Sequence, residues 1–259
     1  MIENEATIRL TVFFGLIVIL ALAEALIPRR TQPARKRWLV NLSLVLTYTL
    51  LVRLLIPAGA AGAALYAADN DIGLFNNFAS PDWLSALLAL LLLDMAIYFQ
   101  HRIFHKVPLF WRLHRLHHSD IDFDFTTAVR FHPLEIFVSM GIKIALILAL
   151  GAPLVSVILF EIILSGAALF NHANLAIPRT LDRILRWFIV TPDMHRIHHS
   201  VRRQETDSNF GFSISLWDRI FGSYRSNPVD DHRTMPIGIE QFREPQEQRF
   251  GALLLQPFR

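Results

Sequence analysis

The sequence contains no cysteine and few charged residues. Without a thiol, the 259-residue chain forms no disulfide framework, no thiolate zinc site, no cysteine-ligated iron–sulfur cluster and no c-type haem attachment. Charged residues make up 18% of the chain, hydrophobic residues make up 53%, and the mean hydropathy is +0.38. A soluble globular chain has about 25% charged and 45–50% apolar residues. The composition therefore excludes a disordered chain and indicates an integral membrane protein.

Several short catalytic and nucleotide-binding motifs are also missing. The sequence contains no Gly-x-Gly-x-x-Gly, no His-Glu-x-x-His and no Glu-x-x-His. Their absence argues against a nicotinamide- or flavin-binding fingerprint, a zincin protease and a soluble di-iron bundle, respectively. The isoelectric point of 9.6 accompanies a net charge of only +3, so we expect basic residues beside a membrane and no nucleic-acid partner.

Five apolar runs are long enough to cross a bilayer, which takes about 17–25 helical residues. They are residues 6–27, 38–56, 83–99, 134–150 and 153–170. The last two flank Gly151-Ala152-Pro153, a spacing that predicts a tight helical hairpin. The small-residue run 58–68 is left unassigned. The sequence thus predicts an all-α membrane bundle, with residues 1–259 forming a single domain.

The distribution of arginine and lysine orients these spans. Five basic residues lie between the first and second spans, none lies between residues 69 and 82, and bases return after Phe99. We therefore expect the first and third connections and the tail after Phe170 to face the cytoplasm, with the N-terminus outside. Regions 100–133 and 171–225 would then form a cytoplasmic helical cap.

Eight of the 11 histidines fall in three clusters. These are His101 and His105; His114, His117 and His118; and His195, His198 and His199. Residues at i, i+3 and i+4 share a helix face, so each cluster is expected to aim its imidazoles at one point. Eight nitrogen ligands exceed the roughly four that one zinc ion takes and suit two metal ions. The neighbouring bases could instead bind lipid headgroups, but such a patch needs charge rather than imidazoles at helical spacing.

The residues alone leave the metal open, because imidazole suits zinc, copper, iron and nickel. Two metals held by neutral histidines at a membrane face favour dioxygen chemistry on a lipid. Two other functions stay open at this point. One is a zinc-dependent membrane hydrolase, and the other is a non-enzymatic metal- or haem-binding membrane protein. Zinc can also replace iron in a histidine-rich site during purification.

Between Asp94 and Tyr224 the sequence resembles the fatty acid hydroxylase / sterol desaturase superfamily of integral-membrane di-iron oxygenases. The resemblance is carried by the three histidine clusters in order and by segments 124–135 (DFTTAVRFHPLE), 171–174 (NHAN), 191–195 (TPDMH), 207–211 (DSNFG) and 217–222 (WDRIFG). It implies two iron ions, dioxygen as co-substrate, and hydroxylation or desaturation of a C–H bond in a lipid or sterol-like substrate. It also implies that His172 is a ninth metal ligand, where the alternative is a histidine bonded to Asn171 or Asn174.

The resemblance leaves the electron donor open, because the cytochrome b5 domain that some relatives carry is not recognised in this sequence. We expect an external donor of the ferredoxin or cytochrome b5 type, and the basic cytoplasmic face would suit an acidic protein. The expected location is the bacterial inner membrane, with the active site facing the cytoplasm.

Two single residues near the clusters have competing interpretations. His132 precedes Pro133 and is either a ligand, a neighbour of the metal, or a structural residue where the chain enters the membrane. Asp94 lies about two helical turns before His101, on the same face. As an acid within a span it is a functional candidate, either accepting a hydrogen bond from a ligand or pairing with a base.

Other polar residues are candidates for supporting the ligands. A ligating histidine usually donates its second ring N–H to a carboxylate or carbonyl. The candidates for this role are Asp193, Asp207, Asn209 and Asp218. We expect Arg130 and Glu135 to form a structural ion pair, and His232 to be only a surface residue.

Overall fold

The computed structural model describes residues 5–31 and 36–259, and this part of the chain is helical, with isolated β-bridges and no strand. Its longer helices are α1 (Glu5–Leu26), α2 (Lys36–Leu55), α3 (Gly59–Asp69), α5 (Asp82–Lys106), α6 (Pro108–His118), α7 (Pro133–Leu150) and α8 (Leu154–Asn171). Its short elements are α4 (Leu74–Asn77), η2 (Phe125–Val129), α9 (Arg179–Leu185), α10 (Pro192–His198), α11 (Arg203–Thr206), α12 (Leu216–Ile220), α13 (Phe250–Leu255) and η3 (Gln256–Phe258). The predicted all-α fold is confirmed.

Five helical segments of the described chain are long and apolar enough to cross a membrane. They are Thr7–Leu26, Arg37–Asn77, Asp82–Lys106, Pro133–Leu150 and Leu154–Asn171. At most a third of the most apolar stretch of each is buried inside the protein. Large side chains such as Phe14, Leu46 and Leu54 point outward with 58%, 60% and 76% exposure. An apolar surface of this kind suits lipid rather than water.

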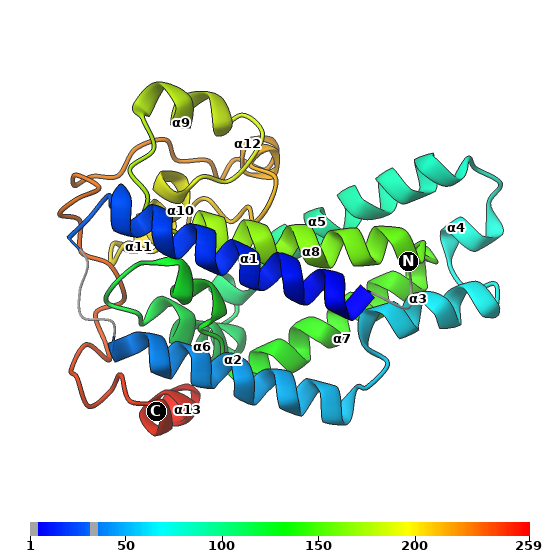
Figure 1. The fold of residues 1–259 in the computed structure, drawn as a ribbon, viewed down its shortest axis with the longest axis horizontal. Coiled ribbons are helices and arrows are strands. Elements are labelled where there is room, and N and C mark those ends of the chain that lie inside the picture. Colours follow the sequence, from blue (N-terminus) through cyan, green and yellow to red (C-terminus); the bar gives the residue numbers. More distant parts are fainter. Residues whose placement is uncertain (1–4, 32–35) are drawn as a thin grey trace.

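The helices pack around α7 and α8. Helix α1 packs on α8, α2 packs on α7, and α3 packs on both α7 and α8 (Figure 1). The run 58–68, which the sequence left unassigned, forms most of α3. Its buried residues Ala60, Ala63 and Ala64 join Leu93 and Phe160 in the main core, because alanines let the helix backbones approach closely.

The predicted hairpin between α7 and α8 is present. Gly151 ends α7 in the left-handed conformation, with φ of 59°, and Pro153 precedes the first residue of α8. A side chain at Gly151 would place its Cβ 2.6 Å from the Ile72 carbonyl oxygen, so glycine is required for contact as well as conformation. The hairpin sets α7 and α8 side by side.

The short helices from α9 onward gather at one end of the bundle, together with α6, whereas α4 lies at the other end (Figure 1). The last residues of the chain return to α6 and fix it there. The Arg112 Nε donates to the Pro257 carbonyl at 2.7 Å, and the Arg115 guanidinium donates to the Gln256 carbonyl at 2.6 Å. The C-terminal segment therefore holds the helix that carries the second histidine cluster.

Candidate metal centre

Local sequence signals place the three histidine clusters on helix ends. Helix α5 continues beyond its apolar part to His101 and His105. Helix α10 has Pro192 at its first position, and the Thr191 hydroxyl caps its amino end by accepting from the Met194 amide at 3.3 Å. These are the residue types that helix starts favour. The clusters are thereby presented on rigid elements.

The structure brings nine histidines together in two adjacent groups. The five-histidine group is His101, His105, His114, His118 and His198, and the four-histidine group is His117, His172, His195 and His199. Within each group, one nitrogen from every ring lies within 4.8 Å of the corresponding atom of every other ring. The rings of His118 and His199 stack across the boundary with centroids 4.4 Å apart. All nine residues are buried.

The second and third clusters divide between the two groups, contrary to the expectation that each would aim at one point. His114 and His118 join the five-histidine group, while His117 joins the other. Likewise His195 and His199 lie together and His198 lies apart. At about 100° per residue, i+3 and i+4 lie on opposite sides of residue i, roughly 100° from each other. When two metal sites lie on either side of the helix, residues i and i+4 therefore reach one site and residue i+3 reaches the other.

The four-histidine group has the nitrogen spacing of a metal site. The Nε2 atom of His172 lies 3.1 Å from Nε2 of His117, 3.1 Å from Nε2 of His195 and 3.2 Å from Nε2 of His199. Ligands about 2.0–2.1 Å from a tetrahedral metal lie about 3.3 Å apart. Four neutral rings cannot satisfy one another at a single point, since each offers only one N–H. A shared cation satisfies all four.

Three rings of the five-histidine group are fixed through their outer Nδ1 atoms, which leaves their Nε2 atoms available to bind a metal ion. The Nδ1 atoms of His101 and His198 donate to the carbonyls of Phe210 and Ser208, each at 2.8 Å. The Nδ1 atom of His114 lies 2.6 Å from a Glu135 oxygen. In all three rings the buried Nε2 atom has no hydrogen-bond partner among the described residues. This is the arrangement of ligating histidines whose outer nitrogen is fixed by an acceptor.

Burial keeps these imidazoles neutral, as metal ligands must be. It lowers the pKa of His114 and of His172 to about 3. Burial, followed by neighbouring histidines, lowers the pKa of His117, His118 and His199 well below the ordinary value. At neutral pH the rings offer lone pairs rather than positive charge. The residues present therefore fit two metal ions.

Glu135 is a functional residue that the sequence interpretation assigned to another partner. The predicted Arg130–Glu135 ion pair is wrong, because Glu135 bonds His114 and Arg130 bonds elsewhere. An acid at the start of an apolar span was the available signal. The sequence could not show that α7 begins beside His114.

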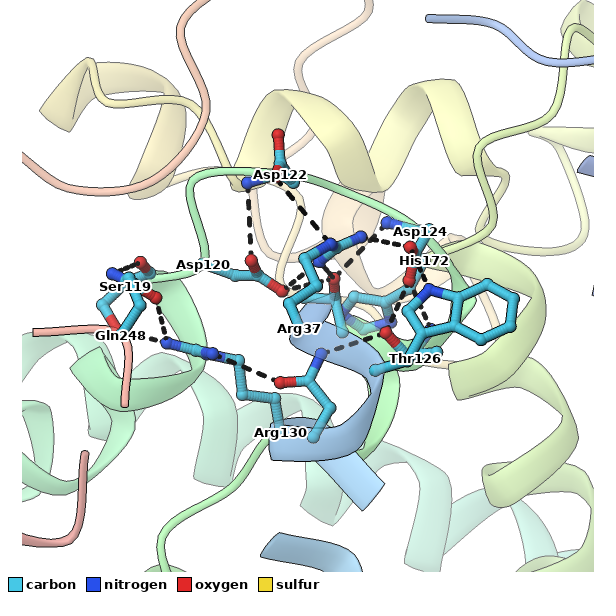
Figure 2. Close-up of polar contacts among 12 residues, drawn as sticks. Arg37, Ser119, Asp120, Asp122, Asp124, Thr126, Arg130, His172 and Gln248 are labelled. Atoms are coloured by element: carbon cyan, nitrogen blue, oxygen red, sulfur yellow. Dashed lines mark hydrogen bonds and ion pairs between the residues drawn. The ribbon is translucent and has the colours of Figure 1, made fainter. Parts of the chain in front are cut away.

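Figure 2 shows where Arg130 lies instead. Its guanidinium donates to the Ser119 hydroxyl at 3.1 Å and the Gln248 side chain at 2.7 Å. Nearby, Arg37 bonds the carboxylates of Asp120 and Asp124. These contacts anchor the segment between α6 and α7 to α2 and to the C-terminal region. They fix the segment that follows His117 and His118 without contacting the metal-binding nitrogens.

His132 and Asp94 both lie outside the two groups. His132 caps α7, with Nδ1 accepting from the Leu134 amide at 3.1 Å and Nε2 donating to the Leu254 carbonyl at 3.2 Å. With both nitrogens engaged, His132 has the structural role. The Asp94 carboxylate accepts from the Trp217 indole at 2.8 Å, which ties α12 to α5.

Asp193, in α10, and His232 lie next to each other and outside both histidine groups. Asp193 forms ion pairs with Arg29 and Arg196 and contacts no histidine of either group. His232 lies 4.0 Å from Asp193, and its side chain is only 14% exposed. The expectation that His232 is a surface residue is therefore wrong, because the polar tail folds back over α10.

Two of the three remaining candidates, Asp218 and Asn209, support the ligands through the backbone, and Asp207 does not. The Asp218 carboxylate accepts from the amides of Phe210 and Gly211 at 2.7 and 2.8 Å, which fixes the carbonyl that His101 uses. Burial raises the pKa of Asp218 to about 6. Asn209 lies in the sequence between Ser208 and Phe210, whose carbonyls accept from the histidines. It has φ of 52°, and its side-chain amide donates to the Met194 carbonyl at 3.0 Å. Asp207 lies 3.6 Å from His105 Nδ1, beyond hydrogen-bond range, and pairs with Lys106.

A cavity of about 660 Å³ runs from the five-histidine group into the bundle. His101, His114 and Glu135 line it near the metal centre. Its apolar walls include Phe13, Leu16, Ile97, Phe104, Phe131 and Leu169. This volume falls within the range of about 300–1,000 Å³ that small-molecule sites occupy. A long apolar ligand would lie with one part beside His101 and His114.

Comparisons with known proteins agree with this geometry. The fatty acid hydroxylase family model matches residues 86–223, which include all nine histidines. The chain is 28% identical to the ornithine lipid hydroxylase OlsE of Rhizobium tropici, covering 95% of this chain and 74% of that protein. It is 30% identical to human alkylglycerol monooxygenase, covering 56% of this chain, and 24% identical to human cholesterol 25-hydroxylase, covering 55%.

The extent of these matches differs among the relatives. The chain spans about a third of the alkylglycerol monooxygenase (31%) and about half of the cholesterol 25-hydroxylase (52%). No solved structure matches the chain.

Proposed function

Because the chain belongs to the fatty acid hydroxylase family, a family of membrane oxidoreductases, we propose that it hydroxylates a C–H bond of a membrane lipid, using two iron ions and dioxygen. One observation carries the proposal: two adjacent groups of buried, neutral histidines lie at one end of the helical bundle, and two of these residues, His101 and His114, line a largely apolar cavity. Hydroxylation is favoured over desaturation because the relatives named above are hydroxylases and monooxygenases.

The nine grouped histidines would hold the metals, five around one ion and four around the other. Bound iron would supply the reduction of dioxygen and the oxidation of an unactivated C–H bond, placing one oxygen atom in the product and releasing the other as water. The protein holds the imidazoles neutral and oriented through Glu135 and the carbonyls of Ser208 and Phe210. The apolar walls of the cavity orient the substrate and exclude water.

The reaction needs electrons from outside the chain, and we propose a ferredoxin or cytochrome b5 type donor. The histidine end would face the cytoplasm, since the connection between the first two spans carries five basic residues. The bacterial ornithine lipid hydroxylase supports a bacterial inner membrane. Residues 1–259 would act as one membrane domain.

The two rival functions receive no specific support. A bis-histidine haem protein needs two opposed rings with a porphyrin between them. Here neighbouring rings such as His105 and His198 lie with centroids only 4.6 Å apart. A hydrolase needs a free general base, and the carboxylate nearest the centre, Glu135, is bonded to His114.

Metal analysis and lipid mass spectrometry test the proposed function together. Cells expressing the protein should accumulate a lipid heavier by one oxygen atom, and the purified protein should contain iron. Oxidation should stop when oxygen is excluded, although lipid still binds. Undiminished anaerobic turnover with zinc alone would contradict the oxygenase and favour the hydrolase.

A further inference from the structure

The cavity has a second polar end, far from the histidines. Arg9, Arg53, Lys143 and Glu161 all line it. Lys143 lies eight residues after Glu135 in α7, and Glu161 lies 11 residues before His172 on α8. At 1.5 Å per residue, the two ends of the cavity are about 12–16 Å apart along the bundle. Figure 1 shows the starts of α1 and α8 and the end of α2 at the opposite end from α6 and α10.

At this second end of the cavity, the carboxylate of Glu161 lies close to several basic side chains. Glu161 is 7% exposed and lies 2.7 Å from Lys143 on one oxygen and 2.7 Å from Arg9 on the other. Arg53, in the last turn of α2, also lies within electrostatic reach of Glu161. Within the described residues, no carboxylate lies within 4.0 Å of Arg53. Lys143 and Glu161 balance each other, and Arg53 adds positive charge.

Positive charge inside a membrane segment is costly unless it has a partner, and so it marks a candidate ligand site. Glu161 alone would tie α1, α7 and α8 together, and Arg53 is not needed for that tie. An additional anion entering the cavity would bond the arginine, which donates in a planar fork suited to carboxylate and phosphate oxygens. The adjoining walls are apolar, so the rest of the ligand is hydrocarbon.

We propose that this end of the cavity binds the anionic head group of an amphiphilic substrate, a carboxylate or a phosphate, through Arg53 and Lys143. Its alkyl chain then runs along the apolar walls toward His101 and His114. The substrate class rests on the proposed function, whereas the anion site itself does not. The oxidised carbon lies about 12–16 Å from the anionic group.

Binding to the purified full chain in neutral detergent tests the site without turnover. The probes are hexadecanoate, hexadecyl phosphate and hexadecanol, which share an alkyl chain and differ in head group. We expect at least one anionic probe to bind roughly tenfold more tightly than the alcohol. The tighter of the two anions identifies carboxylate or phosphate as the head group. Equal binding of all three probes would overturn the proposal.

Three variants sharpen this test. Arg53→Gln, on an exposed side of α2, should abolish the preference for the anion, whereas Arg179→Gln, at the start of α9 and outside the cavity lining, should leave it intact. Glu161→Gln removes the competing carboxylate and should strengthen anion binding. A mere structural ion pair predicts the reverse, namely lower stability with no gain in anion affinity. Retention of the preference in Arg53→Gln contradicts the proposal even if Glu161→Gln does not fold.

These results separate the two proposals. If anionic probes bind as expected but the iron-loaded protein consumes no oxygen with any lipid, the proposed function fails and the anion site stands. If a neutral lipid is hydroxylated while the anion preference is absent, the function stands and the anion site fails.

Discussion

The two histidine groups have the same ligand chemistry but different surroundings. The five-histidine group reaches the cavity through His101 and His114 and is held from behind by one carboxylate and two carbonyls. In the four-histidine group, one bond of this kind is seen among the described residues, from His172 Nδ1 to the Ala168 carbonyl at 2.8 Å. Phe131 stacks on His117 at 4.5 Å and also lines the cavity.

The difference indicates separate duties for the two sites. The five-histidine group would place its metal beside the substrate, and Glu135 would orient one of its ligands, His114. No histidine of the four-histidine group lines the cavity, and Phe131 stacks on His117 between them, so the metal of this group would lie away from the substrate. Substitutions in the two groups should therefore have different effects on metal content.

The largest effect is expected from removing a ligand. His199→Ala leaves three histidines in its group, whereas His118→Ala leaves four in the other. Metal content and lipid oxidation should fall in both variants. Residues that bond the outer nitrogen of a ligand typically contribute 10–100-fold to metal affinity, and losing the ligand itself should cost more. We therefore expect iron affinity to fall more than roughly 100-fold in His199→Ala. The loss should be smaller in His118→Ala, because four histidines remain in its group. Elemental analysis of the purified proteins measures the difference.

The control for this experiment is His232→Ala, which lies outside both groups and should retain iron and activity at neutral pH. A His118→Ala or His199→Ala protein with full iron and full activity would refute the ligand assignment. Membrane insertion should persist in all three proteins, because the apolar spans carry it.

A smaller effect is expected from Glu135→Gln. The substitution replaces the carboxyl group that orients the His114 ring with an amide, and such partners typically contribute 10–100-fold in metal affinity or activity. The loss should be confined to one metal per chain. Asp94→Asn is a matched control, because its amide oxygen can still accept from Trp217. An equal loss in both variants would mean that Glu135 acts only on folding.

Asp218→Asn should act mainly on stability. The Asp218 carboxylate accepts from two backbone amides and from the Ser223 hydroxyl, and an amide cannot accept on both sides. We expect a loss of roughly 2–3 kcal/mol in the free energy of unfolding, with a several-fold loss of metal from the five-histidine group alone. Thermal unfolding in detergent and iron analysis measure the two effects. An unchanged midpoint would show that Asp218 does not hold the Phe210 carbonyl.

The smallest effect concerns His232, a half-buried histidine that lies outside both groups. Burial lowers the pKa of His232 to about 4, from an ordinary value of about 6.5. A lowered folded-state pKa means that stability is complete above pH 6.5 and is lost as the pH falls toward 4. Between pH 7 and pH 5 this loss is about 2 kcal/mol at most. His232→Gln should lose less stability than the wild type over that interval, and parallel curves would contradict it.

Hydropathy and helical spacing were sufficient to predict the spans, the all-α fold and the clustering of the histidines. These properties depend on neighbours within about one turn of helix or on the thickness of a bilayer. The same information failed for Glu135, Arg130 and His232, whose contacts described above join residues 11 or more positions apart. Such pairs depend on how the helices meet, which no local pattern encodes.

The sequence by itself therefore determined that imidazoles at helical spacing gather beside a membrane bundle. Only the tertiary structure decided how they divide, because the angular offset between i+3 and i+4 has meaning only relative to the neighbouring helices. It also decided which backbone carbonyls accept from His101 and His198, since every residue carries a carbonyl and its side chain does not reveal which one is used. The cavity likewise exists only between helices, so its cationic end at Arg53 and Lys143 follows from packing.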